Sequence, residues 1–509
     1  MRSLLLLLPA LSAVCGYKIL CVFPVPSHSH NTLGRGVVNA LLKAGHQVTW
    51  VTPYPFKNED KNLTLIDSET ASYGKLHNMA DPKLAKAGLS FVRAFSGNIT
   101  RATITNKMLR DVLINGHFDA VCTEWFFSPL DAGFAAILKI PWIMLNSVSY
   151  NSMLEEMLDE VRSVSTVPMF MNDAPLPMSF KDRIVNTAMH LMLVFGNFMH
   201  SFSVEADYNT LYGPLAAARG VTLPPFSEIK NNISILLVNS HPSVAVTPVM
   251  PANVIQIAGY HIQEHVPPLP EDLKSIIDSS PCVVYFSMGS VIQSAELPAE
   301  TQRALAQALG APRCAVLWKL ERALALPLPR NVHVRPWMPQ TSILAHPNVK
   351  LFITHGGMLS SLEALHYGVP LLAVPVFGDQ PGNAARAARA GYARTVPFSH
   401  DMGPLLENTL NEMLANDTYY KRAKYLSKLF RNRAVPASKL ISHYIEIAIE
   451  SKGAYHLRSP ANLYAWYERW MLDQVAAVLA VLALLVIIVK KLFSFFTSGK
   501  KEKRKEKRN

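Results

Sequence analysis

The sequence predicts an α/β protein made of two Rossmann-like halves, each with a parallel sheet. Two series of short apolar runs rich in β-branched residues alternate with segments of helical spacing, as buried parallel strands joined by crossover helices do. The length of 509 residues exceeds one ordinary core, which favours two domains. A long apolar segment near the C-terminus, followed by a basic tail, adds a predicted transmembrane helix.

A secretory signal peptide is expected over residues 1–16. Arg2 precedes a short apolar core, and Ala13-Val14-Cys15-Gly16 supplies the small residues that a signal peptidase needs. A signal anchor is the alternative, but the apolar core is too short to span a bilayer. The mature chain should therefore begin near Gly16 or Tyr17.

The N-terminal domain is expected over residues 17–245. Its loop after the first strand lacks the GxGxxG pattern of a dinucleotide site, and residues 58–110 are polar and loop-rich. The Met- and Phe-rich stretch 189–202 has helical spacing, and we expect it to pack in the core. Lining an apolar acceptor cleft or resting on a membrane are the alternatives. Strands are predicted at 18–23, 47–52, 118–123, 142–145 and 233–238.

A Pro-rich linker is expected over residues 246–270, followed by a second domain over 271–452. Its last helix, 437–452, is amphipathic and should pack back across both domains. Polar residues follow two predicted strands, where ligands bind in open α/β sheets. These residues are His355, Glu363, Asp379 and Gln380. Strands are predicted at 282–287, 315–318, 332–335, 349–353 and 371–376.

The C-terminal segment predicts a single membrane span. A juxtamembrane segment, 453–470, carries aromatic residues typical of a membrane interface and precedes the transmembrane helix at 471–491. From Lys490 to Asn509 there are nine Lys/Arg and two Glu, a net charge of +7 out of the chain's +12. The positive-inside rule therefore predicts a cytoplasmic tail at 492–509 and lumenal domains. Because most of the excess charge lies in this tail, nucleic-acid binding is disfavoured.

The remaining signals fit a type I protein of the endoplasmic reticulum membrane. Lys505 and Lys507 stand fifth and third from the end and resemble a KxKxx retrieval signal. Four sequons provide predicted glycosylation sites in a lumenal domain: Asn62, Asn98, Asn232 and Asn416. Cys15 should leave with the signal peptide. The other four cysteines stand singly in apolar runs and are expected as buried free thiols: Cys21, Cys122, Cys282 and Cys314.

Residues 352–380 resemble the signature of the UDP-glycosyltransferases, which conjugate small lipophilic molecules. The pattern is F-I-T-H-G-G-x-x-S-x-x-E, six residues, then P-L-L-x-x-P-V-x-x-D-Q. The resemblance extends to GHQVT, WMPQ and the spanning helix with its basic tail, and it looks most like the invertebrate branch. It implies a GT-B fold, in which an N-terminal acceptor-binding domain and a C-terminal UDP-sugar-binding domain face a cleft. It also implies a role in detoxification and is compatible with homo- or hetero-oligomers.

The resemblance implies a donor site in the second domain. Glycines and a helix start at His355-Gly356-Gly357 favour an anion there, and the diphosphate is expected at His355, Gly357 and Ser360. Uracil is expected at Trp337 and Gln340, the ribose at Glu363, and the sugar at Asp379 and Gln380. The other strand end adds three diphosphate residues: Ser287, Gly289 and Ser290.

The resemblance also implies His30 as the general base, with His28 as its rival. A histidine has a pKa near working pH, and a carboxylate behind it would orient the ring. The family has Asp at this second position, whereas this chain has Glu124, with Asp131 as the alternative. The sequence has no DxD pair, which fits metal-independent transfer with no cofactor besides the UDP-sugar.

The expected reaction is inverting transfer of a hexose, glucose in the first place, to a hydroxyl of a small lipophilic acceptor. Three alternatives remain open at this point. The chain could use glucuronic acid, or act on a lipid or sterol. It could also be a non-catalytic lumenal carrier that keeps only the fold.

Overall fold

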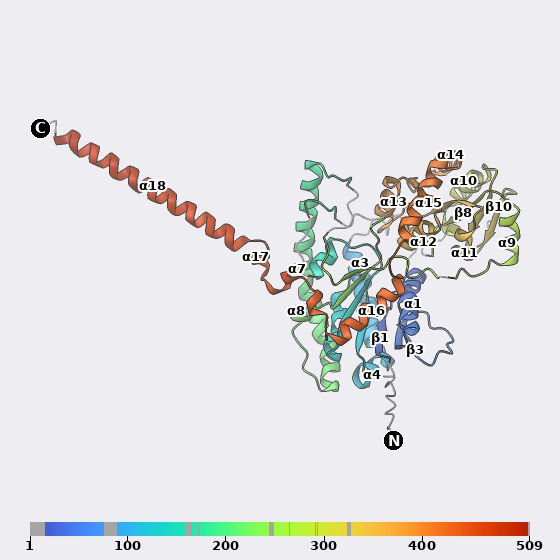
Figure 1. Cartoon of the computed structure of the whole chain (residues 1–509), viewed down its shortest axis with the longest axis horizontal. Helices are drawn as coiled ribbons and strands as arrows, with labels where there is room; N and C mark the ends of the chain where they lie inside the picture. Colours follow the sequence, from blue (N-terminus) through green and yellow to red (C-terminus); the bar gives the residue numbers. More distant parts are fainter. Residues whose placement is uncertain are drawn as a thin grey trace, which may run out of the picture.

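The computed structural model describes residues 16–75, 89–158, 164–169, 174–243, 249–263, 265–290, 292, 294–322 and 327–506. Residues 1–15, which hold most of the predicted signal peptide, lie outside this part of the chain, as does the end of the predicted retrieval signal at 507–509. Figure 1 shows two α/β bodies side by side and one long helix that leaves the N-terminal body.

The N-terminal body is built on a seven-stranded sheet in which all neighbours are parallel. Its order is β3 (Leu63–Asp67), β2 (Gln47–Thr52), β1 (Lys18–Val22), β4 (Ala120–Trp125), β5 (Trp142–Asn146), β6 (Ile235–Val238) and β7 (Val254–Gln256). The central strands are buried on both faces, as crossover helices on each side of a parallel sheet require. Its helices are α1 (His28–Lys43), α3 (Leu89–Thr105), α4 (Lys107–Asn115), α5 (Ala132–Leu138), α6 (Ser152–Met157), α7 (Phe180–Arg219) and α8 (Phe226–Ile229).

The C-terminal body repeats this pattern with six parallel strands. Their order is β10 (Val332–Arg335), β9 (Ala315–Lys319), β8 (Val283–Ser287), β11 (Val349–Thr354), β12 (Leu371–Ala373) and β13 (Ala393–Thr395). Its helices are α9 (Glu271–Asp278), α10 (Ala299–Gly310), α11 (Gln340–Ala345), α12 (Met358–Tyr367), α13 (Gln380–Arg389), α14 (Gly403–Ala415) and α15 (Asp417–Arg431). The two strand orders correspond, so the prediction of two Rossmann-like domains is confirmed.

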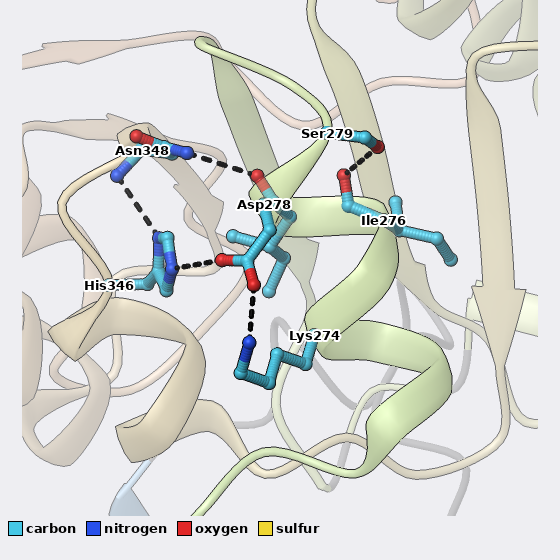
Figure 2. Close-up of polar contacts among 7 residues, drawn as sticks. Lys274, Ile276, Asp278, Ser279, His346 and Asn348 are labelled. Atoms are coloured by element: carbon cyan, nitrogen blue, oxygen red, sulfur yellow. Dashed lines mark hydrogen bonds and ion pairs between the residues drawn. The ribbon is translucent and has the colours of Figure 1, made fainter.

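A polar cluster holds α9 against the chain that enters β11 (Figure 2). The carboxylate of Asp278 accepts from Lys274 Nζ at 2.5 Å and pairs with His346 Nε2 at 3.0 Å. The backbone N–H of Asn348 donates to Nδ1 of the same histidine at 3.2 Å. Because Asn348 directly precedes β11, these bonds help to fix the strand that ends at the His355 loop.

Two segments differ from the expectations, whereas the last helix of the second domain returns to the first as expected. The supposedly loop-rich stretch 58–110 contains β3 and α3, because an edge strand and a half-exposed helix need few apolar residues. The expected linker 246–270 includes β7, the last strand of the first sheet. The helix α16 (Ala437–Glu450) returns to the N-terminal body, where Ile441 and Ile445 pack in a core with Ile19 and Leu33.

The cysteine expectation is half wrong. Cys21 and Cys122 are buried and free, as expected. Cys282 and Cys314, however, form a disulfide. They directly precede β8 and β9, whose residues Val283 and Ala315 are register partners, so the fold brings together two thiols that are 32 positions apart in the chain.

The core expectation for the Met- and Phe-rich stretch is also wrong. Leu193 and Val204 of α7 are buried, but most of the large apolar side chains between them are exposed. Helical spacing was sufficient to predict α7, but only the packing of α7 against α3, α4 and α5 selects which face is covered.

The C-terminal segment forms α17 (Trp466–Arg469) and α18 (Leu472–Glu506). Within the described chain, α18 is the one helix long and apolar enough to cross a membrane, over Leu472–Phe495. It projects from the N-terminal body without packing on it (Figure 1).

Candidate active site

The strand order determines where the first catalytic candidates meet. In the first sheet, β1 and β4 are neighbours at the point where the order of strands reverses, which opens a crevice beyond their carboxyl ends. His30 lies in the first turn of α1, shortly after β1. Glu124 lies near the end of β4, one residue beyond the register pair Val22 and Thr123. Residues 94 positions apart therefore reach the same crevice.

His30 and Glu124 form a hydrogen-bonded pair. Nδ1 of the imidazole lies 2.5 Å from Oε1 of the carboxylate, and the Glu124 side chain is fully buried while that of His30 is 20% exposed. Glutamate in place of the family's aspartate thus still reaches the ring. This geometry leaves Nε2 of His30 as the ring nitrogen that does not face the carboxylate.

The environment of His30 raises its pKa. Burial acts to lower the pKa, but the charge of Glu124 and its hydrogen bond favour the imidazolium, and the charge of Asp379 adds to this. The sum lies above the ordinary value of about 6.5 for histidine. The ring therefore holds a proton readily at Nε2, which a base in transfer chemistry must do.

The two alternatives for this pair lie in different surroundings. Asp131 is buried, and burial together with the charge of Glu124 raises its pKa well above the ordinary range, which favours the neutral acid. No described hydrogen bond joins Asp131 to His30. His28 is exposed and stacks on Tyr54, with ring centroids 4.6 Å apart, rather than facing a carboxylate.

Aromatic side chains form the wall beside His30. The ring of Phe126 stands edge-on to the imidazole, with centroids 5.2 Å apart, and it contacts Phe95 and Phe127 in turn. Phe127 also lines a cavity of about 380 Å³ between α3 and α7. The surroundings of His30 are therefore apolar on the side of the N-terminal domain.

The loops of the second sheet form a compact cradle around His355. Its imidazole packs on two glycines: a Cβ at Gly289 would lie 2.6 Å from Cε1 of His355, and a Cβ at Gly357 2.4 Å from Nε2. Gly289 also has φ +80°, a conformation that favours glycine. Gly357 caps α12, so backbone N–H groups at the start of this helix face the same cradle.

Two serines complete this part of the site. The Ser287 hydroxyl is buried and accepts from the backbone N–H of Gly289 at 3.2 Å. Ser290 follows Gly289 and is half-buried. The expected diphosphate residues from both strand ends are thus close together around His355.

Lys319 is a member of this cradle that the sequence reasoning missed. It ends β9, donates to the carbonyl of Gly289 at 2.9 Å and pairs with Glu321 at 2.7 Å. Burial, followed by the charge of Lys319, lowers the pKa of His355 to about 4, so the imidazole is neutral at pH 7. A lysine at the carboxyl end of an apolar strand was the signal that could have identified it.

A polar chain links the expected uracil, diphosphate and ribose residues. The Gln340 amide donates to Glu363 Oε2 at 2.6 Å and to Ser360 Oγ at 3.1 Å. Burial raises the pKa of Glu363 to about 7, although the bond from Gln340 opposes this. Glu363 therefore changes charge near neutral pH.

His261 was also missed, because it lies in the expected linker. Its side chain is buried, and Nε2 lies 3.7 Å from Glu363 Oε1. Neither ring nitrogen has a hydrogen-bond partner. Burial lowers the pKa of His261 to about 4, so the ring is neutral beside this carboxylate at pH 7.

Trp337 stands at the opening of a cavity between the domains. Its side chain is 65% exposed, unlike a core tryptophan. Together with His28, Arg35 and His261 it lines a cavity of about 350 Å³. A large exposed aromatic face at the edge of such a cavity is suited to stacking a planar ring.

Asp379 and Gln380 lie at the start of α13. The Asp379 carboxylate accepts from the Asn383 amide at 2.5 Å. The Gln380 amide oxygen accepts from the backbone N–H groups of Val376 and Phe377 at 2.9 and 3.1 Å, so it closes its own loop. Gln380 thus retains only its amide N–H groups for a ligand.

The two half-sites face each other across the cleft. The charges of Asp379 and His30 influence each other's pKa, although the residues belong to different domains. His28 and Trp337 also meet across the cleft, with ring centroids 6.2 Å apart. A ligand held beside Asp379 in the second domain would therefore be within reach of His30 in the first.

The four sequons have different surroundings. Asn62 is exposed in the turn before β3. Asn98 lies within α3, and Asn232 accepts from Arg458 at 2.5 Å. Asn416 caps α15 by accepting from the backbone N–H of Thr418. Of the four sequon asparagines, Asn62 is the one that is exposed, lies outside any helix and has a side chain with no described hydrogen bond.

Comparison with known proteins identifies the family. The family described as "UDP-glucoronosyl and UDP-glucosyl transferase" matches residues 18–508. UDP-glucosyltransferase 2 of Dactylopius coccus is 29% identical over 96% of each chain, and UDP-glycosyltransferase UGT5 of the same organism is 30% identical over 93% of this chain and 90% of its own. UDP-glucuronosyltransferase 2C1 of Oryctolagus cuniculus is 30% identical over 81% of this chain and 82% of its own.

Solved structures agree on the fold. The calicheamicin glycosyltransferase CalG4 superposes with a TM-score of 0.56, at 19% identity, covering 85% of this chain and 99% of its own. The glycosyltransferase of kitacinnamycin gives the same TM-score at 18% identity, covering 86% and 99%. The two facing parallel-sheet domains are thus a GT-B fold, and the chain belongs to the UDP-glycosyltransferase family of enzymes.

Proposed function

We propose that this enzyme transfers a hexose, glucose in the first place, from a UDP-sugar to a hydroxyl of a small lipophilic acceptor. The observation that carries the proposal is the His30–Glu124 pair, which lies beside an aromatic wall and opposite Asp379. A base with an oriented tautomer on the acceptor side, and a polar cradle on the donor side, are what such a transfer needs.

The proposed mechanism is a single displacement with inversion. Nε2 of His30 takes the proton of the acceptor hydroxyl while the oxygen of that hydroxyl attacks the anomeric carbon of the sugar. The bond from that carbon to the diphosphate breaks, and UDP leaves with the electron pair. Glu124 holds Nδ1 and stabilises the imidazolium as it forms.

The second domain would hold the donor. Uracil stacks on Trp337, the ribose hydroxyls donate to Glu363, and the diphosphate lies in the cradle of His355, Gly357 and Ser360. Asp379 accepts from a sugar hydroxyl, whereas Gln380 donates, because its amide oxygen already bonds the loop. The exposure of Trp337 and the Gln340–Glu363 bond support this order of subsites.

The choice of glucose rests on the invertebrate-like motifs and on the relative from Dactylopius coccus that is named UDP-glucosyltransferase 2. Incubation of the full chain with equal UDP-glucose and UDP-glucuronic acid and a phenolic acceptor tests it. The mass of the conjugate should correspond to an added hexose, with activity retained in EDTA. A conjugate that carries a hexuronate would show that the transferred sugar is glucuronic acid and not glucose. The absence of any conjugate would favour the carrier hypothesis.

We also propose a type I orientation in the endoplasmic reticulum membrane, with α18 as the anchor. The Cys282–Cys314 disulfide supports an oxidising compartment, and the basic tail supports a cytoplasmic C-terminus. Protease treatment of sealed microsomes should remove only the tail, and glycosidase treatment should shift the mass of wild type more than that of Asn62→Gln. A body digested in sealed microsomes would contradict this orientation.

A further inference from the structure

His261 is a buried histidine whose ring makes no hydrogen bond within the described chain. Its side chain is 1% exposed, and both Nδ1 and Nε2 are shielded from solvent and unpaired. A buried polar group without a partner lowers stability, so its presence in a folded protein indicates a bond that forms in another state of the site. The partner must come from the groups that surround the ring.

The backbone around His261 belongs to the N-terminal body. Shortly before it, the N–H of Ile257 donates to the carbonyl at the end of β6 at 2.9 Å, and Tyr260 packs in the core of this body. A Cβ at Gly36 of α1 would lie 2.8 Å from Cε2 of Tyr260 and 3.2 Å from Cα of His261. The backbone at His261 therefore lies directly against the helix that carries His30.

The side chain of His261, by contrast, reaches the C-terminal body. Nε2 lies 3.7 Å from Oε1 of Glu363, a residue of α12. The other oxygen of this carboxylate, Oε2, accepts from the Gln340 amide at 2.6 Å. Burial lowers the pKa of His261 to about 4, so at pH 7 the neutral ring has one N–H to donate. A residue held by the first domain thus faces the carboxylate proposed for the ribose.

The acceptor capacity of Glu363 leaves room for a bond from His261. An ionised carboxylate has about four lone-pair sites. Gln340 occupies one, and the two ribose hydroxyls of the proposed donor site would occupy two more. The distance of 3.7 Å is too long for a hydrogen bond, but a shift of about 1 Å brings it into the normal range. Closure of the two domains on a donor would favour this shift.

We propose that His261 is a positioning residue for the donor: its Nε2–H donates to Oε1 of Glu363 when UDP is bound, so that both domains hold the ribose carboxylate. This inference rests on the proposed placement of the ribose at Glu363. The bond favours the ionised carboxylate, which accepts from the ribose. It also connects the nucleotide to α1, the helix that carries His30.

The pH dependence of UDP binding tests the donated bond. His261→Gln places an amide N–H near the position of Nε2, whereas the shorter side chain of His261→Asn cannot reach Glu363. In His261→Asn the carboxyl keeps its proton to higher pH, so the midpoint of the pH dependence should rise, and UDP should bind roughly tenfold more weakly at pH 7. His261→Gln should restore both. Unchanged thermal unfolding shows that the two variants are folded, and a wild-type midpoint in His261→Asn would overturn the proposal.

The other titratable groups around this pair have pKa values outside the range of the test. On α12, burial and then the charges of Arg431 and Arg433 lower the pKa of His366 to about 4. Burial raises the pKa of the three neighbouring phenols: Tyr260, Tyr285 and Tyr367. Between about pH 6 and 9, a difference in midpoint between the variants therefore reports the ionisation of Glu363.

A double-mutant cycle tests the connection to α1. Gly36→Ala places a methyl group against Tyr260 and the Cα of His261, so it should weaken UDP binding by displacing His261. Gly36 also lines the cavity of Trp337, and an effect exerted there would add to that of His261→Asn. We expect the double variant to bind UDP no more weakly than His261→Asn alone. Additive losses would overturn the connection to α1.

Glu363→Gln separates this proposal from the placement of the donor. If Glu363→Gln binds UDP as the wild type does at every pH, the ribose lies elsewhere, and the donor site falls together with the role of His261. If Glu363→Gln weakens binding and removes the pH dependence, the donor site stands. In that case a midpoint shared by His261→Asn and the wild type would overturn the role of His261 alone.

Discussion

The ring of His355 occupies the space that a side chain at Gly357 would need, since a Cβ there would lie 2.4 Å from Nε2 of His355. The two residues are separated by only one position, so the imidazole folds back onto the backbone at the start of α12. This contact fixes the ring of His355 at the place where backbone N–H groups point into the cradle.

Gly357→Ala should therefore displace His355 and weaken UDP binding. Because the backbone of Gly357 lies outside the left-handed region, the change acts through space rather than through strain. We expect roughly a tenfold weaker UDP affinity by calorimetry, the order of one lost charge-assisted hydrogen bond. Gly213→Ala in α7, where nothing lies within 4 Å of the added Cβ, is the matched control. Unchanged affinity in Gly357→Ala would remove His355 from the diphosphate site.

His30→Ala should abolish most of the transfer but keep UDP-sugar binding. The loss of a general base lowers kcat by about 10²- to 10⁴-fold, whereas the donor subsites lie in the other domain. Single-turnover rates and UDP calorimetry on the same sample separate the two effects. A kcat close to that of wild type would eliminate His30 as the base.

Glu124→Gln should lower kcat and move the acid limb of the pH–rate profile to lower pH. The base must be neutral to act, so transfer rises with pH through the pKa of His30. Since Glu124 raises that pKa, its neutral isostere lets His30 lose its proton at lower pH. Asp131→Asn is the control and should leave the limb near its wild-type position. An unshifted acid limb in Glu124→Gln would exclude Glu124 as the residue that positions His30. A shifted acid limb in Asp131→Asn would assign that role to Asp131.

UDP binding should strengthen as pH rises through about 7. Burial raises the pKa of Glu363 to about that value, and only the ionised carboxylate accepts from both ribose hydroxyls. Below this pH the neutral acid offers fewer acceptors, so Kd for UDP should rise as pH falls. Titrations at several pH values check this, and Glu363→Gln should remove the dependence. A variant that kept the full pH dependence would point to another group.

Trp337→Ala should weaken UDP binding by roughly tenfold, as expected for a lost base-stacking platform. Trp466 is equally exposed at 65% but lies on α17, so Trp466→Ala is a matched control that should bind UDP normally. Equal affinities for the two variants would place uracil elsewhere in the cleft.

The sequence by itself determined the buried strands at the centre of each sheet and the donor signature, whereas the edge strands β3, β7 and β13 were not predicted. Buried strands such as β8 and β11 can be recognised from a short stretch of sequence, because each must be apolar on both faces over a few residues. Short edge strands have a weaker pattern of apolar residues, and β3 was therefore missed in a stretch that is largely polar. The signature residues from His355 to Gln380 could be recognised because they lie in one βαβ unit and in the loop that follows it.

Only the tertiary structure decided which distant residues meet. The resemblance left Glu124 and Asp131 as candidates beside His30, and the structure places Glu124 there. The fold also joins Cys282 to Cys314, and it puts His261 beside Glu363 and Lys319 beside His355. The packing of α7 likewise decided that its Met and Phe residues face outward. Hydrophobic periodicity indicates which residues share a face of one helix or strand. Which element packs against that face depends on contacts between segments far apart in the chain.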